Sequence, residues 1–240
     1  MNLGISGKRA LITGAEHYLA EAIAVELCRE GVLVALASKD PRRTTHIIKV
    51  IGGTSKGHCA VRIDLDRERQ PAVLLKKLDK IFGDIDIIIS CLDADQYPGG
   101  TRISLDRWRQ VFRRNLETAI EINNCFIPRM KKNRWGRIVN LSSSASMEHA
   151  ATISYCTSKA ALTAYTRCMG RVLATEAGNV VMSAVLPGTK QNSPAGRFAR
   201  PQEISPMVAM LCSVQATYCH GTIVPIDGGQ ARHYYQLERP

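Results

Sequence analysis

The sequence predicts an α/β protein built on one doubly wound parallel sheet of seven strands, with helices on both faces. Two observations carry this prediction. Short runs rich in Val, Ile and Leu alternate with longer helical patterns along the whole chain. These runs are mostly apolar throughout, as strands buried on both faces of a parallel sheet should be. Because no linker, repeat or low-complexity tract interrupts the alternation, we expect a single domain over residues 1–240.

The expected strands are the short apolar runs, at Arg9–Thr13, Val32–Ala37, His58–Ile63, Ile85–Ser90, Arg137–Leu141, Val180–Leu186 and Thr222–Ile226. The expected helices lie between them, at Leu19–Glu30, Pro41–Ile51, Gln70–Phe82, Leu105–Lys132, Ser154–Glu176 and Gln202–Val214. This alternation implies right-handed βαβ crossovers. Since ligands bind beyond the carboxyl ends of the strands in such a sheet, the segments after each strand are where a site is expected.

Composition narrows the class of protein without choosing its partner. Apolar residues make up 45% of the chain and charged residues 22%, which excludes a disordered or fibrous protein. The 32 Lys and Arg against 21 Asp and Glu give a net charge of +11, which favours anionic partners. The basic residues are scattered along the chain, however, and this argues against nucleic-acid binding.

Apolar runs and cysteines bear on the location of the protein. The longest apolar runs, such as Val32–Ala37, are too short to cross a bilayer, and no hydrophobic signal region precedes Lys8 and Arg9. The eight cysteines form no Cys-x-x-Cys pair, and no His lies at ligand spacing from a cysteine pair. We therefore expect a cytoplasmic protein with free thiols, no metal site and no membrane contact.

The strongest chemical signal is the pair Tyr155 and Lys159. Four positions apart on an expected helix, their side chains share one face. A nearby ammonium lowers the pKa of a tyrosine from about 10 toward neutrality, which makes the phenol a usable general acid. Such pairs also occur as solvated surface residues. Upstream, residues 142–144 are three serines that follow an expected strand, where a hydroxyl could bind a substrate carbonyl or simply belong to a polar loop.

With these residues in place, the chain resembles the short-chain dehydrogenase/reductase family, nearest to its 3-oxoacyl carrier-protein reductases. The motifs that carry the resemblance span nearly the whole chain: Thr13-Gly14, Asp64-Leu65, Asn115-Leu116, the run from Gly136 to Ser143, Tyr155 with Lys159, Pro187-Gly188, Gly196-Arg197 with Pro201, and Asp227-Gly228-Gly229. The resemblance implies a Rossmann-like fold, a cofactor half over about residues 1–135 and a catalytic and substrate half over about residues 136–240. It also implies a homodimer or homotetramer.

The implied activity is the reduction of a carbonyl, in a 3-oxoacyl group or a related ketone, to an alcohol with hydride from NADPH. Tyr155 would protonate the carbonyl oxygen, and Lys159 would lower the pKa of Tyr155 and hold the nicotinamide ribose. Ser143 would orient the carbonyl, although a second common family spacing selects Ser142 instead. Asn115 would kink its helix and place a water that links Lys159 to bulk solvent. The substrate would be a small molecule or a carrier-bound carbonyl compound.

The resemblance places the cofactor along residues at strand ends and helix starts: Gly14, Tyr18, Leu19, Ser38, Lys39, Asp64, Leu65, Ser90, Cys91, Tyr155, Lys159, Pro187 and Gly188. At the end of the second strand, an acidic residue usually binds the adenosine ribose of NAD. This chain has Ser38 and Lys39 there instead, and a hydroxyl beside a cation suits a 2′-phosphate. NADP(H) is therefore favoured over NAD(H), with Asp40 close enough to oppose this preference.

Three departures from the family pattern lie around the expected cofactor. The loop T-G-x-x-x-G-x-G, whose glycines let the backbone approach a pyrophosphate, carries Tyr18 and Ala20 in place of two glycines. The sequence N-N-A-G becomes residues 90–93, Ser-Cys-Leu-Asp, which removes another glycine and adds the charge of Asp93. Only Thr189–Ala195 stands where the family usually inserts a helical lid, so we expect an open site.

These departures keep a second interpretation open, namely a non-catalytic scaffold or a dinucleotide-sensing regulator with impaired cofactor binding. The four catalytic residue types favour the enzyme. An open site beside basic residues would suit a substrate attached to an acidic carrier protein or to coenzyme A. The basic residues expected beside the site are Arg129, Lys131, Lys132, Arg134, Arg167 and Arg171.

Overall fold

Seven parallel strands, in the order β3-β2-β1-β4-β5-β6-β7, form one sheet in the computed structural model, which describes residues 2–94, 102–148, 151–188 and 193–231. The strands are β1 (Arg9–Thr13), β2 (Leu33–Ser38), β3 (Cys59–Arg62), β4 (Ile87–Ser90), β5 (Gly136–Leu141), β6 (Val180–Pro187) and β7 (Ile223–Ile226). The predicted fold class is thus confirmed, and every expected strand lies within two residues of its predicted bounds. Four residues of the shortened lid segment, 189–192, lie outside the described residues.

The helices that connect the strands also follow the predicted order. They are α1 (Ala20–Arg29), α2 (Pro41–Val50), α3 (Gln70–Ile81), α4 (Leu105–Phe112), α5 (Thr118–Lys132), α6 (Ala145–Glu148), α7 (Ile153–Glu176) and α8 (Pro201–Leu211). The expectation of one continuous helix over Leu105–Lys132 is wrong. A π-helical stretch at Arg113–Glu117 separates α4 from α5, and the buried Asn115 lies at its centre.

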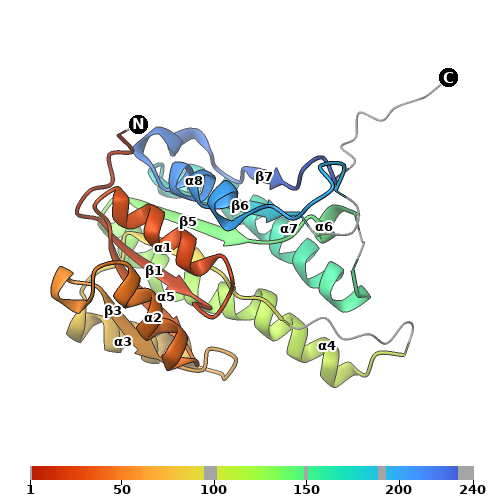
Figure 1. Ribbon diagram of the computed structural model, residues 1–240, viewed down its shortest axis with the longest axis horizontal. Helices are drawn as coiled ribbons and strands as arrows, with labels where there is room; N and C mark the ends of the chain where they lie inside the picture. The colour runs from red at the N-terminus through yellow and green to blue at the C-terminus, as the bar shows by residue number, and fades with distance from the viewer. Residues whose placement is uncertain (1, 95–101, 149–150, 189–192, 232–240) are drawn as a thin grey trace.

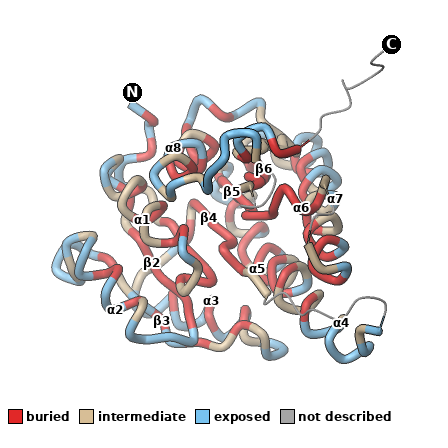
Figure 2. Tube along the Cα trace, turned by 45° about the vertical axis from the view of Figure 1, so that its right-hand side comes forward, coloured by how far each residue is buried: buried red, intermediate tan, exposed pale blue. Residues whose placement is uncertain are grey.

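Helices cover both faces of the sheet (Figure 1). The core on one face packs residues of α1, α2 and α8 against the strands, and the core on the other face uses α3, α5 and α7. Alternation along each strand divides its side chains between the two cores, so that Ala10 and Ile12 belong to the first and Leu11 to the second. Burying one such Ile or Leu side chain contributes about 1.5–3 kcal/mol to stability. The five inner strands β2, β1, β4, β5 and β6 are accordingly buried along almost their whole length, whereas the edge strands β3 and β7 are partly exposed (Figure 2).

The carboxyl ends of β1, β4 and β5 lie side by side at one edge of the sheet. Thr13 pairs with Ser90, and Ser90 pairs with Asn140 across the neighbouring strands. Connections from β1 and β4 run to opposite sides of this point, because β1 leads to β2 and β4 leads to β5. Such a reversal of strand order is where ligands bind in open α/β sheets.

The basic residues expected beside the site lie elsewhere, and that expectation is wrong. Residues 129–134 end α5 and precede the first residue of β5, so they lie at the amino edge of the sheet, opposite the site. Arg167 and Arg171 occupy the second half of α7, which leads back to the same edge. Arg129 forms an ion pair with Asp79, and Lys131 Nζ lies 2.7 Å from a carboxylate oxygen of Glu176. These charges face one another rather than a ligand at the carboxyl edge.

All eight cysteines are described and are free thiols, as expected. Burial raises the pKa of the Cys28 and Cys59 thiols to about 11, so these two thiols are protonated at neutral pH. Within the described residues, no helix combines the length and the apolar character needed to cross a membrane.

Candidate active site

Tyr155 and Lys159 lie on the first turns of α7, which begins after Thr152 at the carboxyl edge of the sheet. Both residues are buried, with relative exposures of 5% and 1%. Their spacing of one helical turn places the Lys159 ammonium 5.6 Å from the centre of the Tyr155 ring. The predicted pair is therefore formed, and it faces the strand ends rather than solvent.

The ammonium of Lys159 is fully engaged by the protein. Nζ donates to the main-chain carbonyls of Leu92 at 3.1 Å and Leu141 at 3.2 Å. It also forms an ion pair with Oδ1 of Asp93 at 2.9 Å. Two of the three donors of the ammonium bond these carbonyls, and its charge is paired with the Asp93 carboxylate. Among the described residues, Asp93 is the only acidic partner of Lys159.

Asp93 also controls the electrostatics of Tyr155. Burial raises the pKa of Tyr155, and the Asp93 carboxylate, which accepts a hydrogen bond from the phenol, raises it further. The expectation of a lowered pKa for Tyr155 is wrong for this conformation, because burial and the nearby carboxylate together outweigh the ammonium. Burial is the largest effect on Asp93 and acts to raise its pKa too, but the charge of Lys159, with smaller contributions from other neighbours, outweighs burial and keeps the pKa of Asp93 below its usual value.

The two candidate serines have different partners. Ser142 Oγ donates to the main-chain carbonyl of Lys159 at 3.0 Å and lies 3.0 Å from Oγ1 of Thr163, so it fastens α7 to the end of β5. Ser143 contacts the Tyr155 hydroxyl, and its hydrogen bond acts to lower the pKa of that phenol. Ser143 Oγ also accepts from the amide of Ala145 at 3.1 Å. Of the two, Ser143 is the serine that the structure brings to Tyr155.

Asn115 joins two parts of the site through both ends of its amide. Oδ1 accepts from the main-chain amide of Ala94 at 2.8 Å, and Nδ2 donates to Oγ of Ser158 at 2.9 Å. The π-helical stretch turns the side chain inward, where it is completely buried. Asn115 therefore ties the segment after β4 to α7. Its expected role in placing a water stays a prediction.

The loop between β1 and α1 packs closely on the end of β4. Gly14 has a φ of +68°, and a Cβ added there would lie 2.7 Å from the carbonyl oxygen of Cys91, so only glycine fits. Leu19 is buried in the core. Tyr18, which replaces a family glycine, is 54% exposed, and its ring centre lies 4.6 Å from that of His17. The Tyr18 side chain is thus partly exposed, and after burial it is the charge of Asp93 that raises the pKa of its phenol.

His17 is a neutral neighbour of Asp93. Its Nδ1 accepts from the amide of Leu19 at 3.3 Å, which leaves the proton on Nε2, 3.8 Å from Oδ2 of Asp93. Burial lowers the pKa of His17 to about 4, although the charge of Asp93 acts in the opposite direction. Because the ring carries no charge at neutral pH, the ion pair of Asp93 is formed with Lys159.

At the end of β2, the main partner of Ser38 is Glu16, an acidic residue that the sequence did not predict as part of the site. Ser38 Oγ donates to Oε2 of Glu16 at 2.5 Å and accepts from the amide of Asp40 at 2.9 Å. Lys39, with a side chain 58% exposed, lies 3.5 Å from a carboxylate oxygen of Asp66. The hydroxyl and the cation that were expected to bind a 2′-phosphate therefore both have carboxylate partners.

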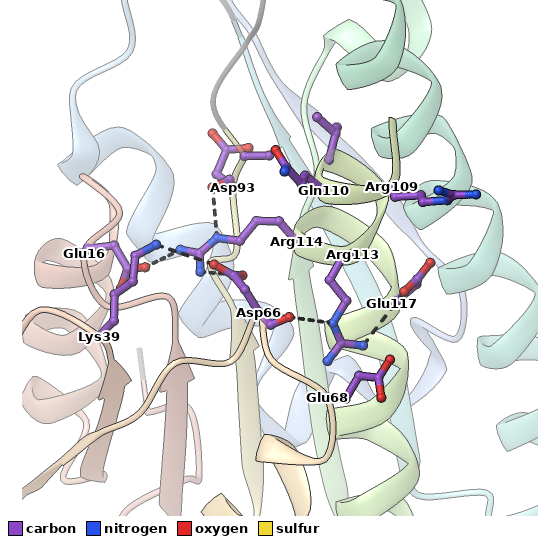
Figure 3. A pocket seen from close by; sticks show the side chains of 12 residues that line it. Glu16, Lys39, Asp66, Glu68, Asp93, Arg109, Gln110, Arg113, Arg114 and Glu117 are labelled. Carbon is purple, nitrogen blue, oxygen red and sulfur yellow. Dashed lines mark hydrogen bonds and ion pairs between the residues drawn. The ribbon is translucent and has the colours of Figure 1, made fainter. Parts of the chain in front are cut away.

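Arg114, also overlooked, crosses the cleft from the π-helical stretch (Figure 3). Its guanidinium forms ion pairs with Glu16 and, at 2.9 Å, with Asp66, and its Nε donates to the main-chain carbonyl of Asp93 at 3.2 Å. A cavity of about 900 Å³ opens here between the loops after β2, β3 and β4 and the α4 side of the cleft. The available signals were an acidic residue in a loop expected to bind phosphate and an arginine directly before Asn115.

The other expected cofactor residues lie at the same edge with structural partners of their own. Asp64 accepts from the amide of Asp66 at 3.2 Å, and the carbonyl of the buried Leu65 accepts from Thr118 at 3.1 Å. Ser90 is buried, and its hydroxyl has no hydrogen-bond partner among the described residues.

The remaining residues expected to bind the cofactor are Cys91, Pro187 and Gly188. The amide of Cys91 donates to Thr13 at 2.9 Å, and burial raises the pKa of its thiol. The carbonyl of Pro187 accepts from the amide of Ser144 at 2.9 Å. A Cβ added at Gly188 would lie 2.7 Å from Cα of Asp227, so this position closes tightly on the turn after β7.

The strand order and the Tyr–Lys pair at the carboxyl edge define a Rossmann-like α/β protein with an enzyme-type site. Residues 8–203 match the short chain dehydrogenase family, and the chain belongs to that family. The 3-oxoacyl-[acyl-carrier-protein] reductase FabG of Aquifex aeolicus is 28% identical over 249 residues, which cover 95% of this chain and 99% of that protein.

Two solved structures show the same fold at lower identity. L-sorbose reductase from Gluconobacter frateurii, complexed with NADPH and L-sorbose, has a TM-score of 0.88 and 22% identity over 96% of this chain and 98% of its own. A 7α-hydroxysteroid dehydrogenase complexed with NADH has a TM-score of 0.86 and 24% identity over 96% of each chain. One of these proteins holds NADPH and the other NADH, so their likeness does not choose between the two cofactors.

The polar groups at this edge suit a nicotinamide dinucleotide, with one exception. The cleft beside Glu16 and Lys39 has room for a nucleotide, and the buried ammonium of Lys159 lies at the reversal point of the sheet. The exception is Asp93, which lines the cleft and forms an ion pair with Lys159. The residues fit the nicotinamide half of a dinucleotide once the Asp93 carboxylate turns away.

Proposed function

We propose that this protein is a nicotinamide-dependent oxidoreductase that reduces a carbonyl group to an alcohol. The observation that carries the proposal is the convergence of a tyrosine phenol, a serine hydroxyl and a lysine ammonium at the carboxyl edge of the sheet. The Tyr155 hydroxyl contacts Ser143, and Lys159 lies one helical turn away. A scaffold has no need for this combination of buried groups.

Each residue has a definite task in this proposal. Ser143 would donate a hydrogen bond to the substrate carbonyl and orient it beside Tyr155. Tyr155 would transfer its phenolic proton to the carbonyl oxygen as negative charge develops there. Lys159 would stabilise the resulting tyrosinate and would hold the ribose hydroxyls of the dinucleotide. When bound, the reduced nicotinamide would supply the hydride.

For the cofactor we propose NADP(H), with Glu16 as the residue that limits this preference. Lys39 is exposed at the end of β2, and its 3.5 Å contact with Asp66 is loose enough for a phosphate to replace. Arg42 is exposed nearby. Against NADP(H), the Glu16 carboxylate bonded to Ser38 would repel the two negative charges of a 2′-phosphate and would accept from a free ribose hydroxyl.

For the substrate we propose a 3-oxoacyl compound or a related ketone, free or attached to a carrier. Support comes from the relatives of the chain, several of which are 3-oxoacyl-[acyl-carrier-protein] reductases at 25–28% identity over at least 94% of this chain. Association as a homodimer or homotetramer remains a prediction from the same resemblance.

One observation favours a second candidate function, a non-catalytic regulator or scaffold. With two donors of Lys159 bonded to main-chain carbonyls and its charge paired with Asp93, a nicotinamide ribose would have to compete with a carboxylate for this ammonium. If this conformation persisted in the presence of dinucleotide, Ser143, Tyr155 and Lys159 would catalyse no reaction.

The deciding experiment is the variant Tyr155→Phe, assayed with NADPH and acetoacetyl-coenzyme A. Removal of the phenolic proton should reduce turnover by about 10²–10⁴-fold and leave NADPH binding nearly unchanged. Tyr218→Phe is the matched control, because Tyr218 is 97% exposed and loses the same hydroxyl. Equal turnover in both variants would contradict the role of Tyr155. Absence of turnover in the unmodified protein with NADPH and NADH alike would favour the non-catalytic function.

A further inference from the structure

The ion pair between Asp93 and Lys159 lies where the proposed dinucleotide needs the same lysine. Lys159 has a side chain 2% exposed, with two of its three donors fixed on main-chain carbonyls that belong to the ends of the sheet. Its charge is paired with Asp93, whose side chain is 33% exposed and borders the cleft. The only replaceable partner of Lys159 in the described structure is therefore this carboxylate.

The main chain at Asp93 is fixed, but its side chain is not enclosed. Arg114 Nε binds the carbonyl of Asp93 at 3.2 Å, and Asn115 binds the next amide, that of Ala94, at 2.8 Å. The carboxylate can therefore leave Lys159 by rotation about its own side-chain bonds while these two contacts stay in place. Around it lie Tyr155, the neutral His17 and the phenol of Tyr18, none of which carries a positive charge to replace the ammonium.

We propose that Asp93 is an internal competitor of the cofactor, which holds Lys159 until the nicotinamide ribose displaces its carboxylate. This inference rests on the proposed function, since it concerns the same site. A neutral diol must replace a charged carboxylate on a buried ammonium, so the exchange costs free energy that the rest of the dinucleotide must supply. The apparent affinity falls in proportion to the fraction of molecules in which Lys159 is available.

The test compares how two probes bind the unmodified protein and Asp93→Ala. NADPH contains the nicotinamide ribose, and 2′,5′-ADP contains only the adenosine half. Loss of the carboxylate should tighten NADPH binding by about tenfold or more, which is about 1.4 kcal/mol, and leave 2′,5′-ADP binding unchanged. Fluorescence and calorimetric titrations measure both affinities without any turnover.

Two further variants control this comparison. Asp106→Ala removes an equally charged carboxylate from α4, where Asp106 has a side chain 82% exposed and pairs with Arg109 of the same helix. It should bind both probes as the unmodified protein does. Asp93→Asn keeps the shape of the side chain, so it guards against loss of folding in Asp93→Ala, and thermal unfolding of each variant confirms a folded chain.

The outcomes separate this inference from the proposed function. The proposal that Asp93 competes with the cofactor would be overturned by equal NADPH affinities in the unmodified protein, Asp93→Ala and Asp93→Asn. It would also be overturned if none of the three proteins bound NADPH. An equal gain for 2′,5′-ADP would also overturn it, because a general loosening of the cleft would then explain both gains. If Asp93→Ala bound NADPH more tightly than the unmodified protein but reduced no carbonyl probe, the proposed function would be contradicted. The proposal that Asp93 competes with the cofactor would still be supported.

Discussion

Asp93 Oδ1 lies 2.9 Å from Nζ of Lys159, and through this ion pair one carboxylate reverses the expected effect of the lysine on its tyrosine. A free ammonium beside a phenol favours the tyrosinate, but a paired ammonium presents almost no net charge. Asp93 additionally accepts from the phenol of Tyr155 and so favours its protonated form. The acid strength of Tyr155 thus depends on where the Asp93 side chain lies.

The first prediction is that Asp93→Asn lowers the pKa of Tyr155. Without the carboxylate, the Lys159 ammonium acts on the phenol unopposed by Asp93, although burial still raises the pKa of Tyr155. Ultraviolet titration of tyrosinate, taken as the difference between Asp93→Asn and the double variant with Tyr155→Phe, isolates this group. In the unmodified protein the same difference should titrate above the ordinary value of about 10. Identical titration in the two backgrounds would contradict the electrostatic role of Asp93.

The second prediction concerns the stability that the same ion pair supports. Lys159→Met leaves the Asp93 carboxylate without its cation and should lower the free energy of unfolding by roughly 3 kcal/mol, near the low end for buried pairs because Asp93 is partly exposed. Adding Asp93→Ala should recover most of the loss. Urea denaturation at pH 7 of the four members of this double-mutant cycle measures the coupling. Additive losses would show that the pair contributes nothing.

Sequence patterns predicted the sheet well because its strands are buried on both faces. The strand Arg9–Thr13, for example, has three successive apolar residues at its centre, which suits a sheet covered on both faces, and the order of such strands indicates the crossovers. The break between α4 and α5 was not predictable from hydrophobic periodicity. The π-helical stretch Arg113–Glu117 is held by tertiary contacts, among them the bond of Arg113 to the carbonyl of Asp66 at 3.0 Å.

Within the site, local sequence spacing predicted only the contacts between residues that are close in the chain. Tyr155 and Lys159 share a helix, so their proximity follows from helical geometry alone. The sequence marked Asp93 as an added charge, but only the fold brings its carboxylate from the end of β4 to α7. No local pattern marks Glu16, because the signature of a loop that normally binds phosphate is its glycines. Its importance emerges from a contact with Ser38, which belongs to a different strand.

The third prediction is that Glu16→Ser raises the affinity for NADPH relative to NADH. Removal of this carboxylate frees the Ser38 hydroxyl and one side of the Arg114 guanidinium, both of which can then donate to a 2′-phosphate. Charge-assisted hydrogen bonds are worth about 1.5–3 kcal/mol, so the ratio of affinities should change roughly tenfold or more. Titration with each dinucleotide at one ionic strength measures it.

Glu117→Ser is the matched control for this change. Glu117 lines the same cleft, with a side chain 54% exposed and only a 3.9 Å contact to Arg113, so its loss alters the charge without altering the end of β2. Lys39→Asp should move the preference in the opposite direction, toward NADH. If Glu16→Ser and Glu117→Ser shift the ratio equally, the effect is one of net charge and Glu16 does not select the cofactor.

The last prediction is a loss of stability in mild acid that originates at His17. Burial lowers the pKa of His17 from 6.5 to about 4, so between these values the unfolded chain binds a proton that the folded chain does not. The contribution of His17 to stability is therefore complete above pH 6.5 and is lost as the pH falls through 4. Each unit of pKa shift corresponds to about 1.4 kcal/mol, which sets an upper limit of about 3.5 kcal/mol. Urea denaturation at several pH values should show a smaller decrease in the free energy of unfolding for His17→Gln than for the unmodified protein over this range.

Other titrating groups do not produce this difference. The carboxylates of Asp93 and Glu16, whose pKa values lie below their usual range, lose their contributions at lower pH, and His58 acts equally in both proteins. Parallel pH profiles for the two proteins would show that His17 accepts its proton in the folded state as readily as in the unfolded chain.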